Sequence, residues 1–260
     1  MATRRPLVAA NWKMAGSLQL AQELIQKFSR ISGGSPDVVL CPPSVYLDNI
    51  QRKLEAASQT LSGCSLHLGG QNLSHQEFGA YTGEISGGML KEFGCKYVII
   101  GHSERRRMYG ETSDMVAEKF AMAQKMGLTP ILCVGESLAA RQANRTFEVL
   151  AGELDAVLDK VGIMAFDNAV LAYEPLWAIG TGKSATPEQA QEVHAYLRQR
   201  LSALSPYEGE KIRILYGGSV KPSNAADLFT QPDVDGGLVG GASLNASEFV
   251  TLCRIASQAE

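Results

Sequence analysis

The segment from Val170 to Ser184 reads VLAYEPLWAIGTGKS, and its arrangement decides the fold. A short apolar run ends at Tyr173, Glu174 and a proline follow, and a glycine-rich loop leads toward the next helical segment. A carboxylate at a strand end, beside a loop whose amides can hold an anion, suggests chemistry on a small phosphorylated substrate. For this segment alone, an exposed glutamate on an ordinary loop is an equally good interpretation.

The same strand–loop–helix pattern recurs along the whole chain. Apolar runs predict strands that begin near Leu7, Val38, Leu66, Tyr97, Pro130, Val170, Ile212 and Gly236. Four of these runs, those near Val38, Tyr97, Pro130 and Ile212, do not alternate polar with apolar residues cleanly, which favours parallel strands covered on both faces. Eight strand–helix units in 260 residues predict an α/β protein with one (β/α)8 barrel domain over residues 1–260. A doubly wound open sheet is the alternative.

Helix start signals lie between the predicted strands. Ser17 precedes an amphipathic stretch from Leu18 to Phe28, and Ser44 precedes one over residues 45–57. Thr186, followed by a proline and then by Gln189, predicts a capping box for a helix that ends near Leu204. Residues 137–161 are expected to form the longest helical region.

Composition excludes several classes of function. The chain is 45% apolar and 20% charged, with a net charge of -3, so it offers no general attraction for nucleic acid or an anionic membrane. Its apolar runs are too short for a signal peptide or a membrane span. The five cysteines are widely spaced and include no C-x-x-C pair, which favours reduced thiols and a cytoplasmic location.

Polar residues collect where the predicted strands end. The set that we single out contains Asn11, Lys13, Gln71, Asn72, His102, Ser103, Glu104, Glu136, Glu174 and Ser219. In a barrel these ends share one face, so the side chains are expected to surround one site suited to proton transfer. A lone lysine or histidine at a strand end is often only a satisfied surface group. The first turn of a helix after His102 would disfavour the imidazolium form.

Two glycine turns indicate where an anion would bind. They are Gly217–Ser219 and Gly240–Gly241, and they follow the last two predicted strands, where barrels often hold phosphate. Glycines that merely permit tight turns are the alternative. The long polar segment from Gln71 to Glu84 departs from the barrel pattern, and we interpret it as an interface.

Three other motifs are matched only in part. The letters GKS at Gly182 to Ser184 resemble the end of a Walker A loop, but Trp177 occupies the position of its first glycine. The glycines of the same loop lie too far from the strand for a dinucleotide fingerprint. A hydrolase nucleophile elbow is absent, and the scattered histidines and cysteines predict no metal site.

Five runs, taken together and in this order, resemble the triosephosphate isomerase family. They read NWKM at Asn11, GHSERR at Gly101, YEPLWAIGTG at Tyr173, YGGSV at Tyr216 and LVGGA at Leu238, and the resemblance covers essentially the whole chain. It implies a TIM barrel that interconverts dihydroxyacetone phosphate and D-glyceraldehyde 3-phosphate through an enediol(ate), in glycolysis and gluconeogenesis.

The resemblance also implies a role for each motif residue. Glu174 would be the base, His102 a neutral electrophile, and Lys13 and Asn11 would stabilise negative charge. Glu104 would orient Lys13, while Ser103 and Cys133 would support the site. The substrate phosphate would bind amides of Gly180, Ser219, Gly240 and Gly241, under a lid over residues 175–182. Such proton transfer requires no cofactor and no metal.

A homodimer is implied as well. The Gln71–Glu84 loop would insert into a second copy, with Thr82 reaching toward the partner's site. Two rival functions stay open at this stage: a Schiff-base aldolase that uses Lys13, and a catalytically silent barrel that serves as a binding scaffold.

Overall fold

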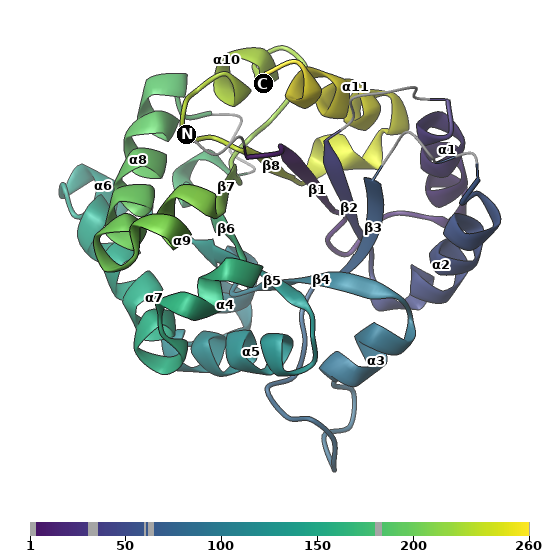
Figure 1. The fold of residues 1–260 in the computed structure, drawn as a ribbon, viewed down its shortest axis with the longest axis horizontal. Coiled ribbons are helices and arrows are strands. Elements are labelled where there is room, and N and C mark those ends of the chain that lie inside the picture. The colour runs from purple at the N-terminus through teal and green to yellow at the C-terminus, as the bar shows by residue number, and fades with distance from the viewer. Residues whose placement is uncertain (1–3, 31–35, 60, 62–64, 180–183, 260) are drawn as a thin grey trace.

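The protein is a closed barrel of eight parallel strands that neighbour one another in chain order (Figure 1). This computed structural model describes residues 4–30, 36–59, 61, 65–179 and 184–259. The strands are β1 (Leu7–Asn11), β2 (Asp37–Cys41), β3 (Ser65–Gly70), β4 (Cys95–Ile100), β5 (Thr129–Val134), β6 (Val170–Tyr173), β7 (Arg213–Tyr216) and β8 (Gly236–Val239). The barrel closes where β1 pairs with β8, and the predicted fold class is confirmed.

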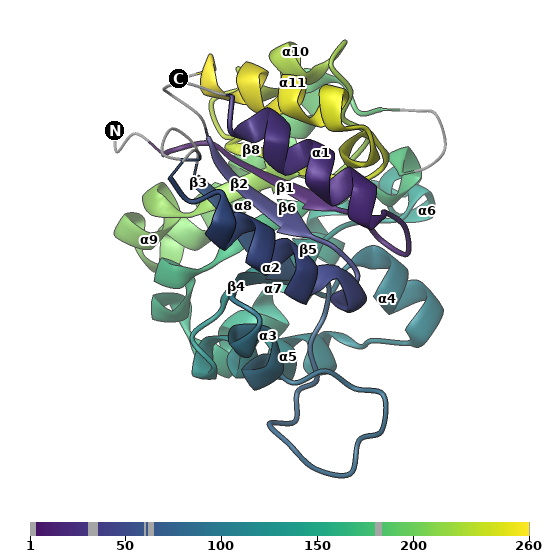
Figure 2. The same cartoon turned by 90° about the vertical axis from the view of Figure 1, so that its right-hand side faces the viewer.

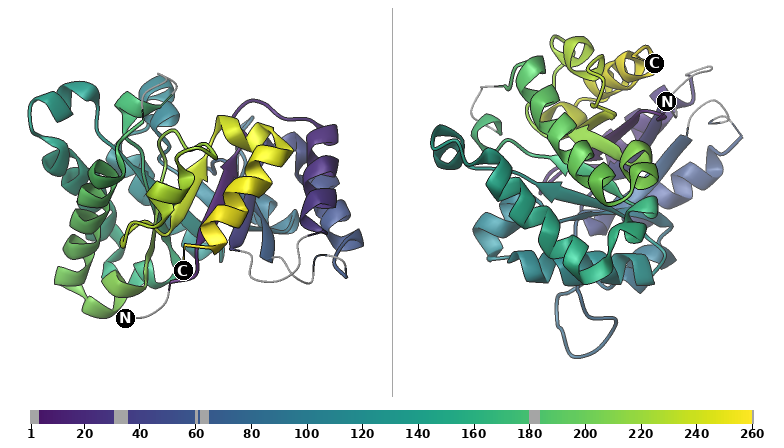
Figure 3. Two further views of the ribbon diagram at one scale, coloured as in Figure 1. Left: turned by 90° about the horizontal axis from the view of Figure 1, so that it is seen from above. Right: turned by 60° about the vertical axis from the view of Figure 1, so that its left-hand side comes forward.

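Helices surround the strands on the outside (Figures 1 and 3). They are α1 (Leu18–Phe28), α2 (Leu47–Ala56), α3 (Gly87–Glu92), α4 (Ser103–Tyr109), α5 (Ser113–Lys125), α6 (Leu138–Gln142), α7 (Thr146–Val161), α8 (Pro187–Leu204), α9 (Pro206–Lys211), α10 (Ala225–Phe229) and α11 (Ala246–Ser257). Four short 3-10 turns complete the described elements: η1 (Ser44–Tyr46), η2 (Ile163–Asn168), η3 (Leu176–Ala178) and η4 (Gly241–Leu244). Among the described residues, no helix combines the length and apolarity that crossing a membrane requires.

The strands lack polar alternation because both of their faces are buried. Along β1, Leu7 and Ala9 belong to an inner cluster that fills the barrel, while Val8 and Ala10 pack with the surrounding helices. The other strands contribute to the same two clusters, except that β3 contributes only to the outer one, through Leu68. Apolar residues are therefore required at consecutive positions, and the polar side chains are left to the strand ends.

Helix caps formed at two of the three helix starts indicated by the sequence, whereas Ser44 begins the 3-10 turn η1 and does not cap α2. The Ser17 hydroxyl accepts the N–H of Leu20 at the start of α1. At the start of α8, Thr186 and Gln189 each accept the other's backbone N–H, which completes the predicted capping box.

The long helical region expected over residues 137–161 is two helices. Asn144 adopts a left-handed backbone with φ 56°, and the N–H of Arg145 bonds back to the carbonyl of Ala140 at 2.8 Å. This geometry ends α6 before α7 begins, because asparagine tolerates the left-handed region better than most residues. Similarly, residues 44–46 form the 3-10 turn η1 ahead of α2.

His194 of α8 makes stability depend on pH. It is fully buried, its ring meets Tyr173 and Tyr216, and its Nδ1 lies 3.1 Å from the carbonyl oxygen of Asp233. Burial lowers the pKa of His194 from 6.5 to about 4. Between these values the unfolded chain binds the proton and the folded chain does not, so stability is lost as pH falls through this window.

We therefore predict that the free energy of unfolding depends on pH more steeply in the wild type than in His194→Asn. The asparagine side chain keeps a hydrogen-bond donor near the position of Nδ1. From pH 7.5 to pH 5, the wild type should lose about 2 kcal/mol more unfolding free energy than the variant, on the scale of 1.36 kcal/mol per pKa unit. Urea unfolding at one fixed protein concentration measures both slopes. Equal slopes would show that His194 does not titrate in this way.

Candidate active site

One cavity at the carboxyl ends of the strands brings the sequence-predicted residues together. It has a volume of 1070 Å³, and its lining includes Asn11, Lys13, His102, Glu174, Ser219, Gly240 and Gly241. Gly180 lies outside the described residues. The lysine, the histidine and the carboxylate thus face one shared space, although they come from three different strand ends.

Glu174 is a buried and ionised carboxylate. Only 2% of the residue is exposed; its Oε2 accepts the Ser103 N–H at 2.9 Å, and its Oε1 lies 3.0 Å from His102 Nε2. Burial raises the pKa of the Glu174 carboxyl, but His102 and the Ser103 N–H together outweigh it and hold that pKa below its usual value. The carboxylate can therefore accept a proton at neutral pH.

The hydrogen bonds of His102 define its tautomer. The residue caps α4, and its Nδ1 accepts the N–H of Glu104 at 3.2 Å, which requires a lone pair on Nδ1. The neutral ring then carries its proton on Nε2, toward Glu174. Burial lowers the pKa of His102, whereas the charge and hydrogen bond of Glu174 raise it, with a raised pKa as the net result. Protonation of Nδ1 would cost the contact with Glu104.

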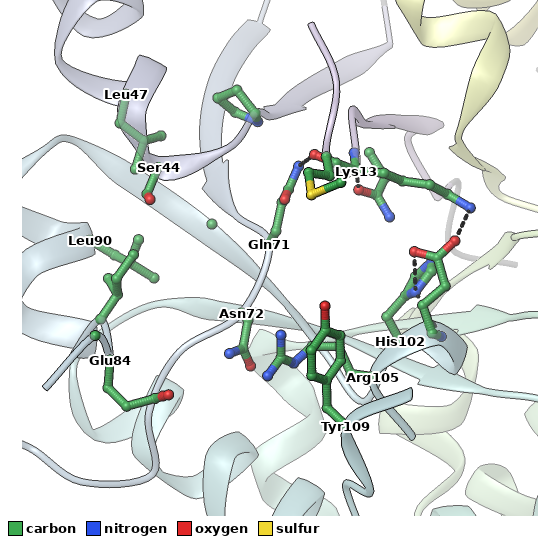
Figure 4. Close-up of a pocket in the computed structure, with 17 residues that line it drawn as sticks. Lys13, Ser44, Leu47, Gln71, Asn72, Glu84, Leu90, His102, Arg105 and Tyr109 are labelled. Carbon is green, nitrogen blue, oxygen red and sulfur yellow. Dashed lines mark hydrogen bonds and ion pairs between the residues drawn. The ribbon is translucent and has the colours of Figure 1, made fainter. Parts of the chain in front are cut away.

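Lys13 is held in an unusual backbone conformation. Its φ of 53° lies in the left-handed region, and Asn11 Oδ1 accepts its N–H at 3.0 Å. Gln71 Nε2 donates to the Lys13 carbonyl, and Lys13 Nζ pairs with Glu104 Oε1 at 2.6 Å (Figure 4). These contacts orient the ammonium group. Such strain is typical of functional sites.

Cys133 lies on β5 within the barrel interior, close to Glu174. Burial, followed by the negative charge of Glu174, raises the pKa of this thiol well above its usual value. A thiol in this setting stays protonated and packs against its neighbours. Cys41 and Cys95 are also buried free thiols, while Cys64 lies outside the described residues.

The predicted phosphate side of the cavity is built from backbone. Ser219 follows β7, and Gly240 and Gly241 follow β8. A Cβ on Gly240 would lie 3.4 Å from Cε of Lys13, so this backbone runs close to the ammonium side chain. Among the described residues, a Cβ on Gly241 would meet no atom within 4 Å, so there is open space at the Cβ position of this residue.

Two residues of the site had no role assigned from sequence. Glu136 is fully buried, and its Oε1 accepts from Tyr173, Trp177 and Arg141 at 3.1, 2.9 and 3.2 Å. It thereby holds the segment that follows Glu174. Gln71 bridges the carbonyls of Lys13 and Cys41. The only sequence signal for either residue was its position just after a strand.

The Gln71–Glu84 segment is a loop that projects from the barrel (Figures 1 and 2). Its base is closed by the N–H of Ser74, which donates to the carbonyl of Ile85 at 2.8 Å. Toward its tip, Phe78 is 86% exposed and Thr82 is exposed. A second cavity of 340 Å³ lies beside the loop, and Lys13 and His102 form one side of it (Figure 4).

Comparisons with known proteins agree with one another. The family model described as triosephosphate isomerase matches residues 6–256. Curated proteins named triosephosphate isomerase from Shewanella loihica, Shewanella amazonensis and Shewanella woodyi are each 70% identical to this chain over 260 residues, which is 100% of both sequences. Among the described residues, no group of three or more His, Cys, Asp and Glu side chains is placed to hold a metal ion.

Proposed function

The chain belongs to the triosephosphate isomerase family, and from this premise we propose that Glu174 is the base of its reaction. The protein is an intramolecular aldose–ketose isomerase that interconverts dihydroxyacetone phosphate and D-glyceraldehyde 3-phosphate in glycolysis and gluconeogenesis. One observation carries the assignment: a buried, ionised carboxylate lies 3.0 Å from a histidine in a cavity that also contains a lysine. Assays of Glu174 variants test it.

The proposed reaction begins with proton abstraction. Glu174 takes a proton from C1 of dihydroxyacetone phosphate, the electrons of that C–H bond form the C1–C2 double bond, and the carbonyl oxygen becomes negative. The His102 Nε2–H donates to this oxygen. Glu174 then returns a proton to C2, and one proton passes from the C1 hydroxyl to the C2 oxygen by way of His102, so that C1 becomes the aldehyde and C2 carries the hydroxyl. The scheme needs a base and an oxyanion stabiliser, and no cofactor enters it.

Charge complementarity assigns the other roles. Lys13, held by Glu104, stabilises the enediolate together with Asn11. The phosphate binds amides of Ser219, Gly240 and Gly241, and of Gly180 on the lid over residues 175–182. Closure of this lid excludes water from the enediolate. These roles are supported by the composition of the cavity, because Lys13 and both glycine turns line it.

Substrate binding should strengthen the base. In the free protein the Glu174 carboxylate rests on the Ser103 N–H and His102, and both contacts lower its pKa. To reach C1 of the substrate, the carboxylate must leave the Ser103 N–H. Burial then dominates and raises its pKa, which makes it a better proton acceptor at the moment of reaction.

We also propose that the protein works as a homodimer through the Gln71–Glu84 loop. Apolar side chains are exposed on this side of the barrel: Phe78 (86%), Met14 (99%), Val45 (81%) and Tyr109 (68%). Exposed apolar groups that surround a cavity favour a protein partner. The loop of a second copy would enter the cavity shown in Figure 4 and bring Thr82 toward Lys13.

Phe78→Asp is expected to convert the protein to a monomer and to lower kcat at least tenfold, because a desolvated carboxylate is costly at an interface and the partner loop supports Lys13. Light scattering after size exclusion would report the change from twice 27.9 kDa to 27.9 kDa. Met164→Asp is the control, since Met164 is 69% exposed on η2, outside the loop. A wild type that is monomeric at micromolar concentration would refute the dimer.

A cytoplasmic location is part of this proposal. It is supported by the buried free thiols Cys41, Cys95 and Cys133, which suit a reducing compartment.

A further inference from the structure

A glutamate lies on the buried side of α7 and has no part in the reaction described above. Glu153 has Leu150 three residues before it and Val157 four residues after it, and both are fully buried. Its own side chain is only 18% exposed. A carboxylate is costly at such a position unless it is paired and hydrogen-bonded, so its contacts need an explanation.

The Glu153 carboxylate reaches the end of β5. Its Oε2 accepts the N–H of Gly135 at 2.9 Å. Its Oε1 lies 3.8 Å from NH1 of Arg106, which is 15% exposed. Arg106 in turn donates to the carbonyl of Gly101 at 2.9 Å and to that of Cys133 at 3.4 Å. Through these contacts, Glu153 and Arg106 connect the backbone at the end of β4 to the backbone at the end of β5.

Gly135 is in direct contact with the backbone of Glu174. A Cβ added to Gly135 would lie 1.9 Å from the carbonyl oxygen of Glu174, so only glycine fits there. Hydrogen bonds on either side join the same two segments: Glu174 N–H donates to Val134 O at 2.8 Å, and Leu176 N–H donates to Glu136 O at 3.1 Å. Whatever fixes Gly135 thus fixes the backbone that carries Glu174.

We propose that Glu153 is a positioning residue for the isomerisation, and that it acts by holding the Gly135 amide against which the backbone of Glu174 rests. This inference depends on the proposed role of Glu174 as the base. Electrostatics agree with the geometry: burial and then the charges of Glu174 and Glu136 raise the pKa of Glu153, while Arg106 and the Gly135 N–H lower it, with a raised pKa as the net result. The acceptor oxygen, and not the negative charge, does the positioning.

Two conservative variants separate these two properties. Glu153→Asp keeps the charge but withdraws the acceptor from Gly135 by one methylene, while Glu153→Gln keeps an acceptor and removes the charge. We expect Glu153→Asp to lower kcat about tenfold with KM within about twofold, because a misplaced base costs rate and not binding. Glu153→Gln should stay within about threefold of the wild type.

Steady-state kinetics is the test, on variants that are folded and have the same oligomeric state as the wild type. Glu148→Gln is the control, because Glu148 lies on the same helix and its side chain is 65% exposed. Glu174→Asp is assayed in parallel. If Glu174→Asp is impaired and Glu153→Asp stays within twofold of the wild type, the positioning role is wrong while the base assignment stands. If Glu174→Asp is unimpaired, the base assignment itself fails. A larger loss in Glu153→Gln than in Glu153→Asp would assign the effect to the charge of Glu153 and overturn the proposal.

Hydrogen exchange gives a readout independent of activity. In the peptide that contains residues 134–136, Glu153→Asp should exchange faster than the wild type, and Glu153→Gln should not. If Glu153→Asp does not fold, the proposal still requires Glu153→Gln to show wild-type protection of this peptide together with near-wild-type kcat. Loss of protection in Glu153→Gln with unchanged kcat would overturn it.

Discussion

Replacing Glu174 with glutamine is expected to lower kcat by about three orders of magnitude and to leave KM within a few-fold of the wild type. Glutamine has nearly the same shape, and its amide oxygen can still accept the Ser103 N–H that Glu174 Oε2 accepts at 2.9 Å. The substitution therefore removes the basicity of the group while largely preserving its position. Binding of the substrate phosphate uses other residues, so the loss should appear in kcat.

Glu248→Gln is the matched control for this prediction. Glu248 lines the same cavity but contacts neither His102 nor Lys13 in any described interaction. It should retain wild-type activity. A Glu174→Gln protein that is folded, dimeric and as active as Glu248→Gln would show that the base lies elsewhere.

Lys13→Met is expected to lower kcat/KM by about two to three orders of magnitude, the range found when an oxyanion-stabilising donor is removed. The ammonium group is the cation that the structure holds at this point of the cavity through Glu104 at 2.6 Å. Methionine keeps the length of the side chain but cannot stabilise the negative oxygen of the enediolate. Lys221→Met is the control, because Lys221 is an exposed lysine at the same cavity.

Trapping with borohydride distinguishes this role from that of a Schiff-base lysine. Wild-type protein treated with dihydroxyacetone phosphate and borohydride should keep its unmodified mass, since an electrostatic role forms no covalent bond. A reduced adduct on Lys13 would point to a covalent mechanism instead.

The sequence predicted the framework well because the framework rests on local patterns. The eight strands begin within two residues of the predicted positions, and α1 has the predicted bounds Leu18–Phe28. Apolar strands and caps such as Ser17 and Thr186 carry this information within a few residues. The break at Asn144 was missed because the mostly polar run from Arg141 to Thr146 contains no glycine or proline to mark the end of a helix.

The supporting contacts of the site were harder to predict because their partners are far apart in the chain. Glu136 meets Trp177, and Glu153 meets both Gly135 and Arg106, through side chains from different elements. Only the closed barrel brings these residues together. The charge state of His102 is a similar case. The helix start that disfavours the imidazolium was visible in the sequence. The opposing effect of Glu174, which raises the pKa of His102, arises only because folding places Glu174 Oε1 3.0 Å from His102 Nε2.

The most direct test of the central claim is the isomerisation of dihydroxyacetone phosphate in D2O, with the product analysed for deuterium at C2. A proton held by the Glu174 carboxylate can exchange with solvent before it is delivered to C2. We therefore predict that the wild type yields D-glyceraldehyde 3-phosphate with deuterium at C2, and that Glu174→Gln loses this product along with turnover. A Glu174→Gln protein that still forms deuterated product at the wild-type rate would show that another group carries the proton and would contradict the account.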